Sequence, residues 1–263
     1  MKTARSRDGT SIMFDQSGAG PAVILVNGAL ADRSAGGPLA ALLAPHYSVF
    51  AYDRRGRGGS GDTAPYAVER EVEDLAAVLA TAGGEAFVFG HSSGAVLALE
   101  AARTLAFKKL ALYEPPFMVD DSRTLPPADY TARLSALVAA GRRGDAVEFF
   151  MTRAVDVPAE MVAQMRNSPQ WWSTMEALAH TLPYDGAVMG DTLHGSPLPL
   201  QRWASVTVPT LVMDGGASPD WARNAVQALV DVLPHAQRRT LPGQTHGVTP
   251  EALAPVLEEF FHE

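Results

Sequence analysis

The sequence contains no cysteine, and none of its apolar runs is long enough to span a bilayer. Without cysteine the fold cannot rely on disulfides or thiolate metal ligands, and the composition suits a reducing compartment. Positive charge is also scarce, since 21 Lys and Arg face 29 Asp and Glu, for a formal net charge of −8. Such a charge repels phosphate backbones, so we expect no nucleic-acid partner.

From the N-terminal segment we expect no targeting signal. The segment Met1–Asp8 carries several charged side chains, and no apolar stretch of signal-peptide length follows it. We therefore expect a cytoplasmic protein that does not associate with a membrane. The basic pairs are interpreted as solvated surface. They are Arg54-Arg55, Arg142-Arg143 and Arg238-Arg239.

What the chain does have is a regular alternation of short apolar strands and amphipathic helical stretches, which begins at Ala22. This pattern predicts an α/β fold, with a mostly parallel twisted sheet covered by helices on both faces. A hairpin signal at Asp8-Gly9 precedes it. The strands are expected at 3–7, 11–15, 22–26, 47–52, 86–89, 109–113, 210–213 and 236–241, and the clearest helical stripes at 68–79, 222–233 and 250–261.

The alternation stops between Glu114 and about Val208, where four prolines lead into helical sequence rich in Met, Trp and Ala. We predict an α/β core of residues 1–114 and 205–263, with residues 115–204 forming a helical lid. Such a lid would lie over the carboxyl ends of the strands, where open α/β sheets place their ligand sites. Its helices are expected at 128–151, 159–166 and 170–182.

Ser92 stands at the centre of Gly90-His91-Ser92-Ser93-Gly94, directly after the apolar run 86–89. A serine between two glycines at a strand end predicts a nucleophile elbow, because the turn into the following helix leaves almost no room for flanking side chains. A serine hydroxyl is a weak nucleophile at neutral pH and needs a base within hydrogen-bonding distance. His246 is the predicted base, since its loop follows the last strand and precedes the last helix.

These features together resemble the α/β-hydrolase family, in particular its serine esterase and lactonase branch. The resemblance covers nearly the whole chain and rests on four segments in matching order. They are Val23–Gly28, Tyr52–Ser60, the elbow and the loop around His246. It implies a serine hydrolase that cleaves a carboxylic ester, lactone or related acyl compound through an acyl-enzyme, without a cofactor.

The resemblance also implies an oxyanion hole made by the backbone N–H groups of Ala29 and Ser93. Asn27 stands where the family usually has histidine. It is expected either to anchor its loop or to contact substrate.

The acid of the triad is ambiguous. In the family's commonest pattern an aspartate lies three residues beyond Gly215, and here Ser218 occupies that position. Glu114 follows the strand next to the nucleophile strand and resembles the acid position of some relatives, so it is the predicted acid. Asp214 and, less favoured, Asp220 are the alternatives, and a dyad without any acid is also open.

The lid and two further motifs complete the predictions. Trp171, Trp172, Met175 and Met189 are expected mostly to pack against the core, but some of them are expected to roof the pocket and to favour an apolar or aromatic substrate. Gly56–Gly61 matches the dinucleotide-binding pattern G-x-G-x-x-G. A dinucleotide site also needs a helix directly after the last glycine, and here Asp62-Thr63-Ala64-Pro65 follows, so we do not expect such a site. The sequence has no HExxH metal motif, so we expect no metal site.

Several functions stay open at this point. The same residues support perhydrolysis, thioester cleavage and carbon-carbon bond hydrolysis. A cofactor-free isomerase or cyclase, or a non-catalytic binding module with a vestigial elbow, are further alternatives.

Overall fold

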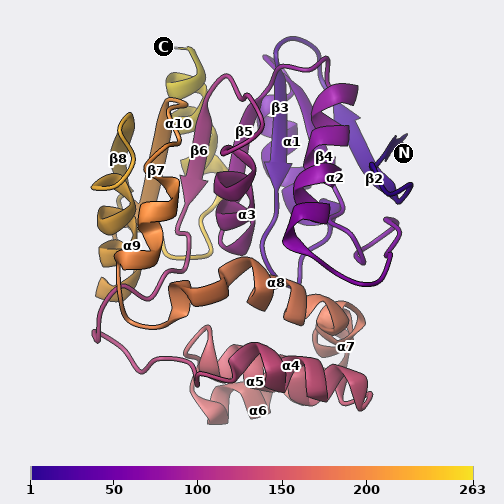
Figure 1. The fold of residues 1–263 in the computed structure, drawn as a ribbon, viewed down its shortest axis with the longest axis vertical. Coiled ribbons are helices and arrows are strands. Elements are labelled where there is room, and N and C mark those ends of the chain that lie inside the picture. The colour runs from indigo at the N-terminus through magenta and orange to yellow at the C-terminus, as the bar shows by residue number, and fades with distance from the viewer. Residues whose placement is uncertain (1, 263) are drawn as a thin grey trace.

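In the computed structural model, which describes residues 2–262, eight strands form one sheet in the order β1-β2-β4-β3-β5-β6-β7-β8 (Figure 1). β1 and β2 pair antiparallel with each other, β2 pairs antiparallel with β4, and all other pairs are parallel. The strands are β1 (Lys2–Arg5), β2 (Ser11–Ser17), β3 (Ala22–Val26), β4 (Ser48–Tyr52), β5 (Phe87–His91), β6 (Leu110–Tyr113), β7 (Thr210–Gly215) and β8 (Ala236–Leu241).

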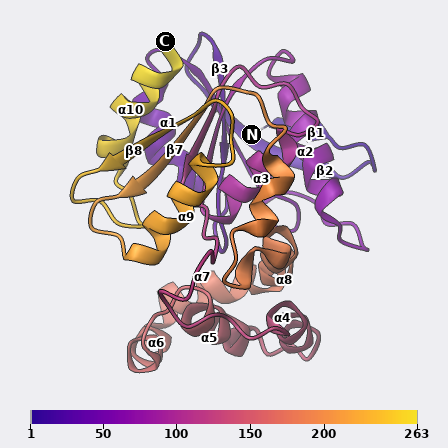
Figure 2. The ribbon, with the colours of Figure 1, turned by 60° about the vertical axis from the view of Figure 1, so that its left-hand side comes forward.

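Helices cover both faces of this sheet, which confirms the predicted fold class (Figure 2). One face is covered by α1 (Gly37–Leu43) and α10 (Pro250–His262). The other face is covered by α2 (Val68–Thr81), α3 (Ser93–Ala101) and α9 (Asp220–Val230). Every residue of β3, β4 and β7 is buried. Helices cover both faces of these strands, and strands in such a position have nearly continuous apolar runs.

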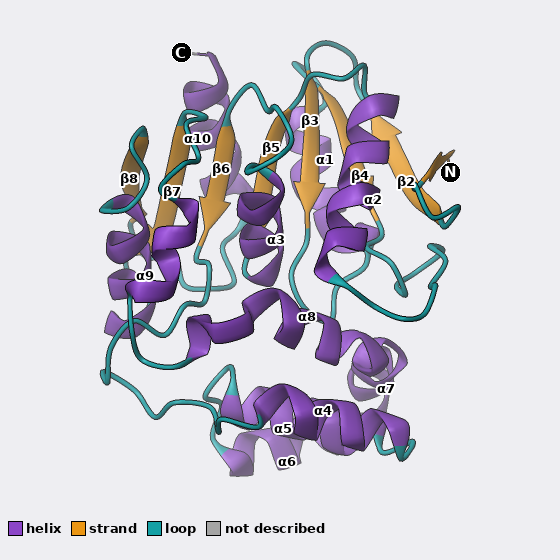
Figure 3. Ribbon diagram, viewed as in Figure 1, coloured by secondary structure: helices purple, strands orange, loops and turns teal. Residues whose placement is uncertain are grey.

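A separate helical layer connects β6 to β7 at the carboxyl ends of the parallel strands (Figures 1 and 3). Its helices are α4 (Tyr130–Ala139), α5 (Arg143–Arg153), α6 (Ala159–Arg166), α7 (Pro169–Leu178) and α8 (Leu182–Met189), with short 3-10 turns at 179–181, 190–193 and 198–203. α8 packs directly on α3, so it joins this layer to the core. The division at residues 114 and 205 stays a prediction.

The helices of the structure differ from the expected ones in two places. The segment 128–151 is two helices, because Gly141 adopts a φ of 71° between α4 and α5 and ends the first of them. The short helix α1 was not predicted. Within residues 2–262, no helix is long and apolar enough to cross a membrane.

Candidate active site

The elbow around Ser92 has a strained backbone with glycine at two closely approached positions. Ser92 lies between β5 and α3 with φ 57° and ψ −129°, in the left-handed half of conformational space. A Cβ on Gly90 would lie 2.6 Å from the Ala95 Cα, and one on Gly94 would lie 2.2 Å from the Val26 carbonyl oxygen. Both glycines are therefore required for the strand and the helix to approach this closely.

Three side chains from separate strand ends form one hydrogen-bonded chain. His246 Nε2 lies 3.1 Å from Ser92 Oγ, and His246 Nδ1 lies 2.8 Å from Glu114 Oε2. Ser92 follows β5 and Glu114 follows the adjacent strand β6, whereas His246 lies in the loop between β8 and α10. The predicted nucleophile, base and acid thus meet at the carboxyl edge of the sheet.

Glu114 is placed to hold a positive charge on His246. Its side chain is 2% exposed, and the Gly215 backbone N–H donates to Oε1 at 2.8 Å. Burial alone would raise the pKa of this carboxyl, but its contacts with His246, the Ser218 hydroxyl and the Gly215 amide lower the pKa below its usual value. Glu114 is therefore ionised at neutral pH. Ser218, at the usual aspartate position, lies beside the carboxylate of Glu114.

The other two candidate acids are engaged elsewhere. Asp214 is fully buried, and its carboxylate accepts hydrogen bonds of 2.5 Å from both Arg238 and Thr240 on β8. Asp220 pairs with Arg223 on the exposed face of α9. The alternative assignment of Asp214 to the triad is contradicted by these contacts, because its side chain points to the neighbouring strand and not to the histidine loop.

The loop that carries His246 is fixed by side chains from the core. The Tyr113 hydroxyl donates to the Thr245 carbonyl at 2.7 Å. His91 Nε2 lies 2.8 Å from the His246 carbonyl oxygen, and the two imidazole rings are 4.9 Å apart. Burial, with a smaller contribution from His246, lowers the pKa of His91 to about 4. His91 is thus neutral at pH 7 and donates from Nε2, a role that its position in the elbow motif did not indicate.

This shift predicts a pH dependence of stability. Between pH 6.5, the ordinary histidine pKa, and about 4, the unfolded chain binds a proton at His91 that the folded chain does not. Stability is therefore lost as the pH falls through this window. His91→Gln keeps a donor for the His246 carbonyl but does not titrate, so we expect its Tm to fall less than that of the wild type between pH 7 and pH 5. An equal fall in Tm in the wild type and in His91→Gln would contradict the lowered pKa of His91.

The predicted oxyanion residues lie beside the nucleophile. A Cβ on Gly28 would lie 2.9 Å from the Ser92 Cβ, so the turn after β3 touches the elbow. Ala29 and Ser93 both line the cavity that contains Ser92. Asn27 also lines it, and its side-chain amide donates to the Asp32 carbonyl at 2.9 Å. Asn27 therefore anchors its own loop, which was one of the two roles expected for it.

Ser92 and His246 open into a cavity of about 900 Å³ between the core and the helical layer. Its walls are mainly apolar, and the layer contributes Tyr130, Phe150, Met189 and Leu193. Asp185 of α8 also lines the cavity.

Of the four lid residues considered for the pocket roof, Met189 lines this cavity, but the prediction was wrong for Trp171, Trp172 and Met175, which do not line it. Trp172 and Met175 are 4% and 7% exposed, and the indole N–H of Trp172 donates to Glu176 at 2.9 Å. Trp171 is 49% exposed on the surface. The reason is that α7 packs against α5 and α6, so its apolar side chains fill the interior of the helical layer itself.

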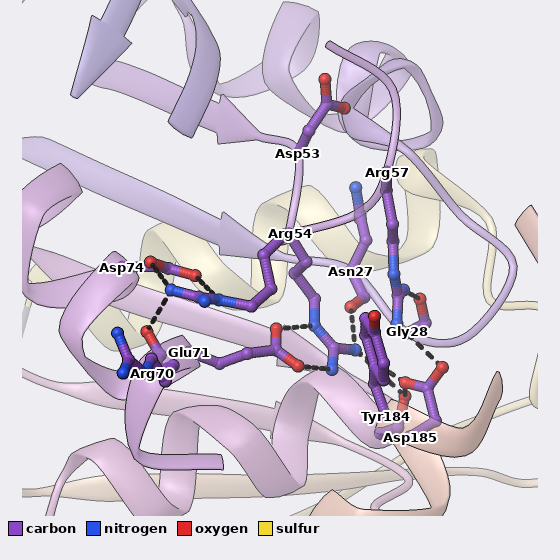
Figure 4. A network of polar contacts seen from close by, with 12 residues as sticks. Asn27, Gly28, Asp53, Arg54, Arg57, Arg70, Glu71, Asp74, Tyr184 and Asp185 are labelled. Atoms are coloured by element: carbon purple, nitrogen blue, oxygen red, sulfur yellow. Dashed lines mark hydrogen bonds and ion pairs between the residues drawn. The ribbon is translucent and has the colours of Figure 1, made fainter. Parts of the chain in front are cut away.

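The interpretation of Arg54 and Arg55 as solvated surface was also wrong. Their exposed fractions are 1% and 0%, and each guanidinium is bound by two nitrogens to a carboxylate of α2. Arg54 pairs with Glu71 (Figure 4). Arg55 pairs with Asp74. The glycine motif 56–61 is a loop after β4, and α2 begins only at Val68, so no helix N-terminus faces it. Among residues 2–262, no three His, Asp or Glu side chains are grouped as metal ligands would be.

Comparisons with known proteins agree with this fold. Residues 23–259 match the sequence profile described as the alpha/beta hydrolase family, and the chain belongs to that family. An alpha/beta hydrolase of known structure from Sphaerobacter thermophilus DSM 20745 is 60% identical over 99% of this chain and 100% of that one, with a TM-score of 0.92. An esterase from Rhodococcus sp. ECU1013 is 21% identical over 100% of this chain and 98% of that one, with a TM-score of 0.67, which shows the shared fold.

A curated relative, the uncharacterized hydrolase YraK of Bacillus subtilis (strain 168), is 38% identical over 96 residues. That match spans 35% of this chain and 35% of the relative. The family and these neighbours support an enzyme of the alpha/beta hydrolase type.

Proposed function

We propose that this protein is a serine hydrolase that cleaves a carboxylic ester, lactone or related acyl compound through an acyl-enzyme on Ser92. The observation that carries the proposal is the continuous chain from Ser92 Oγ through His246 to the ionised carboxylate of Glu114, in the wall of a largely apolar cavity.

Each residue has a defined step. His246 Nε2 accepts the Ser92 proton as Oγ attacks the substrate carbonyl carbon, and Glu114 stabilises the resulting imidazolium. The amides of Ala29 and Ser93 donate to the oxyanion of the tetrahedral intermediate. The intermediate collapses, His246 gives its proton to the leaving alcohol oxygen, and the acyl group stays on Oγ. Water, deprotonated by His246, then releases the acid and restores the Ser92 hydroxyl.

The cavity supports an apolar or aromatic acyl group as the substrate. Phe150, Met189 and Leu193 from the helical layer face Phe89, Leu39 and Trp221 from the core around the same space. Burying apolar surface there contributes about 25 cal/mol per Å² to binding, before the entropy cost of association. Esterases among the structural neighbours, such as the one from Exiguobacterium antarcticum, share the fold and favour this class of reaction.

The proposal is tested with p-nitrophenyl esters of acetate, butyrate, octanoate and benzoate, together with an uncharged lactone. We expect turnover of several of them, with kcat/KM rising from acetate to the longer or aromatic acyl groups. Ser92→Ala is the matched control for background hydrolysis. Rates equal to that control across the whole panel would favour a non-hydrolytic enzyme or a binding module.

A further inference from the structure

Four charged side chains are buried together behind the turn that follows β3 (Figure 4). Arg54 and Glu71 form a two-nitrogen ion pair with both distances at 2.7 Å. Asp185 accepts a hydrogen bond from Arg54 Nη1 at Oδ1 and another from Arg57 Nη2 at Oδ2, each at 2.8 Å. None of the four is more than 4% exposed, and their formal charges cancel.

Arg57 connects this cluster to the predicted oxyanion turn. Its Nη1 donates to the Gly28 carbonyl oxygen at 2.5 Å. That carbonyl and the Ala29 N–H belong to one peptide group, and in a trans peptide the two point in opposite directions. Fixing the carbonyl on the arginine side therefore directs the Ala29 N–H away from Arg57. Gly28 itself lies against Ser92, so the orientation of this peptide decides whether its N–H serves the reacting carbonyl.

Asp185 connects the same cluster to the second oxyanion residue. The Ser93 hydroxyl donates to Asp185 Oδ1 at 2.7 Å. One carboxylate thus holds the residue after the nucleophile directly and the Gly28-Ala29 peptide through Arg57. Asp185 belongs to α8, so the helical layer supplies the group that ties the two halves of the oxyanion hole together.

Stability alone is a poor explanation of this arrangement. Buried ion pairs lose hydration on folding, and apolar replacements of similar volume are often neutral or stabilising. Arg57 in addition has its Nε buried without a hydrogen-bond partner among the described residues, which costs further free energy. A cluster that served only packing would not need a cation aimed at one backbone carbonyl.

We propose that Arg57 and Asp185 are positioning residues, which orient the Ala29 and Ser93 amides so that both donate to the oxyanion. This inference rests on the proposed serine hydrolase. It assigns to α8 a role in transition-state stabilisation besides covering the cavity.

Arg57→Lys and Asp185→Asn test the proposal, with Arg55→Lys as the matched control. Arg55 lies in the same loop, is equally buried and pairs with Asp74, but it does not touch the oxyanion turn. For Arg57→Lys and Asp185→Asn we expect kcat to fall about 10- to 100-fold with KM changed less than about threefold, because only the transition state needs the hole. The affinity for a trifluoromethyl ketone, which forms the tetrahedral adduct, should fall in parallel. Arg55→Lys should lower Tm but keep kcat within about twofold.

Folded Arg57→Lys and Asp185→Asn with wild-type kcat and wild-type ketone affinity would overturn the proposal, as would an equal loss in Arg55→Lys. Crystal structures of the variants give a readout without turnover. The Gly28 carbonyl should leave its wild-type direction in Arg57→Lys but keep it in Arg55→Lys, and an unmoved carbonyl in Arg57→Lys would count against positioning. If wild-type protein hydrolyses no ester, the proposed function fails, whereas the carbonyl direction still decides the role of Arg57.

Discussion

Ser92→Ala is expected to lower kcat by about 10⁶, and His246→Ala by a similar factor, because the first change removes the attacking oxygen and the second removes its proton acceptor. The residual rate should come from substrate binding and from the oxyanion amides alone. The double variant should be no slower than either single one, since the two residues act in the same step. Steady-state kinetics on the best ester of the panel measures all three.

The controls for this prediction are structural. Ser92→Ala leaves the elbow backbone and the His246 loop contacts through Tyr113 and His91 in place. Its Tm should therefore stay close to that of the wild type. A His246→Ala variant that is folded and keeps more than about a tenth of the wild-type kcat would show that another group accepts the proton, in conflict with typical general-base effects of 10² or more.

Glu114→Gln should lower kcat by about 10³ to 10⁴, because a neutral amide can neither stabilise the imidazolium nor hold the tautomer that presents Nε2 to the serine. Asp214→Asn should keep kcat within about threefold and lower Tm instead, since Asp214 bonds to Arg238 and Thr240 on β8. Kinetics and thermal unfolding of the two variants separate the roles. Full activity in Glu114→Gln together with collapse in Asp214→Asn would reverse the assignment.

Ser218 offers a gain-of-function version of the same test. It is buried beside Glu114 and stands three residues after Gly215. Adding Ser218→Asp to Glu114→Gln should place a carboxylate near His246 Nδ1 and recover at least about tenfold of the lost kcat, which corresponds to about 1.4 kcal/mol of transition-state stabilisation. Adding Ser218→Asn instead is the matched control and should recover nothing. Recovery by both would indicate a packing effect and not the charge.

The sequence was sufficient for the parts of the site that depend on local rules. The glycines around Ser92 mark a turn whose close contacts exclude any side chain, and the loop after the last strand has only one histidine. Glu114 was favoured because it follows the strand next to the nucleophile strand and resembles the acid position of some relatives. Asp214 and Asp220 stayed open as alternatives until the contacts of each carboxylate were known.

What the sequence could not supply was the direction of side chains in the helical layer. Trp172 and Met175 lie on an apolar helix face, but periodicity does not tell whether that face meets the cavity or another helix of the layer. The break at Gly141 was missed for a related reason. The residues on both sides favour a helix, so the periodicity gave no sign of the positive φ at this one glycine.

The buried arginines were misread because their partners are distant in sequence. Arg54 and Asp185 are separated by 131 positions, and pairing over such a distance leaves no local signal. One usable signal was present in α2. Glu71 and Asp74 lie on the same side of the helix as Leu75 and Val78, and all four are buried. Carboxylates within an inward-facing stripe require buried cations, and the neighbouring loop supplies Arg54 and Arg55.

Covalent labelling by a fluorophosphonate, followed by mass mapping of the modified peptide, tests the role of Ser92 as the nucleophile. We expect one adduct, on Ser92, formed rapidly in the wild type, more slowly in Glu114→Gln and absent in Ser92→Ala, because only an oxygen activated by His246 attacks phosphorus at a useful rate. An unlabelled Ser92 in folded wild-type protein, or an adduct on another residue, would contradict this role.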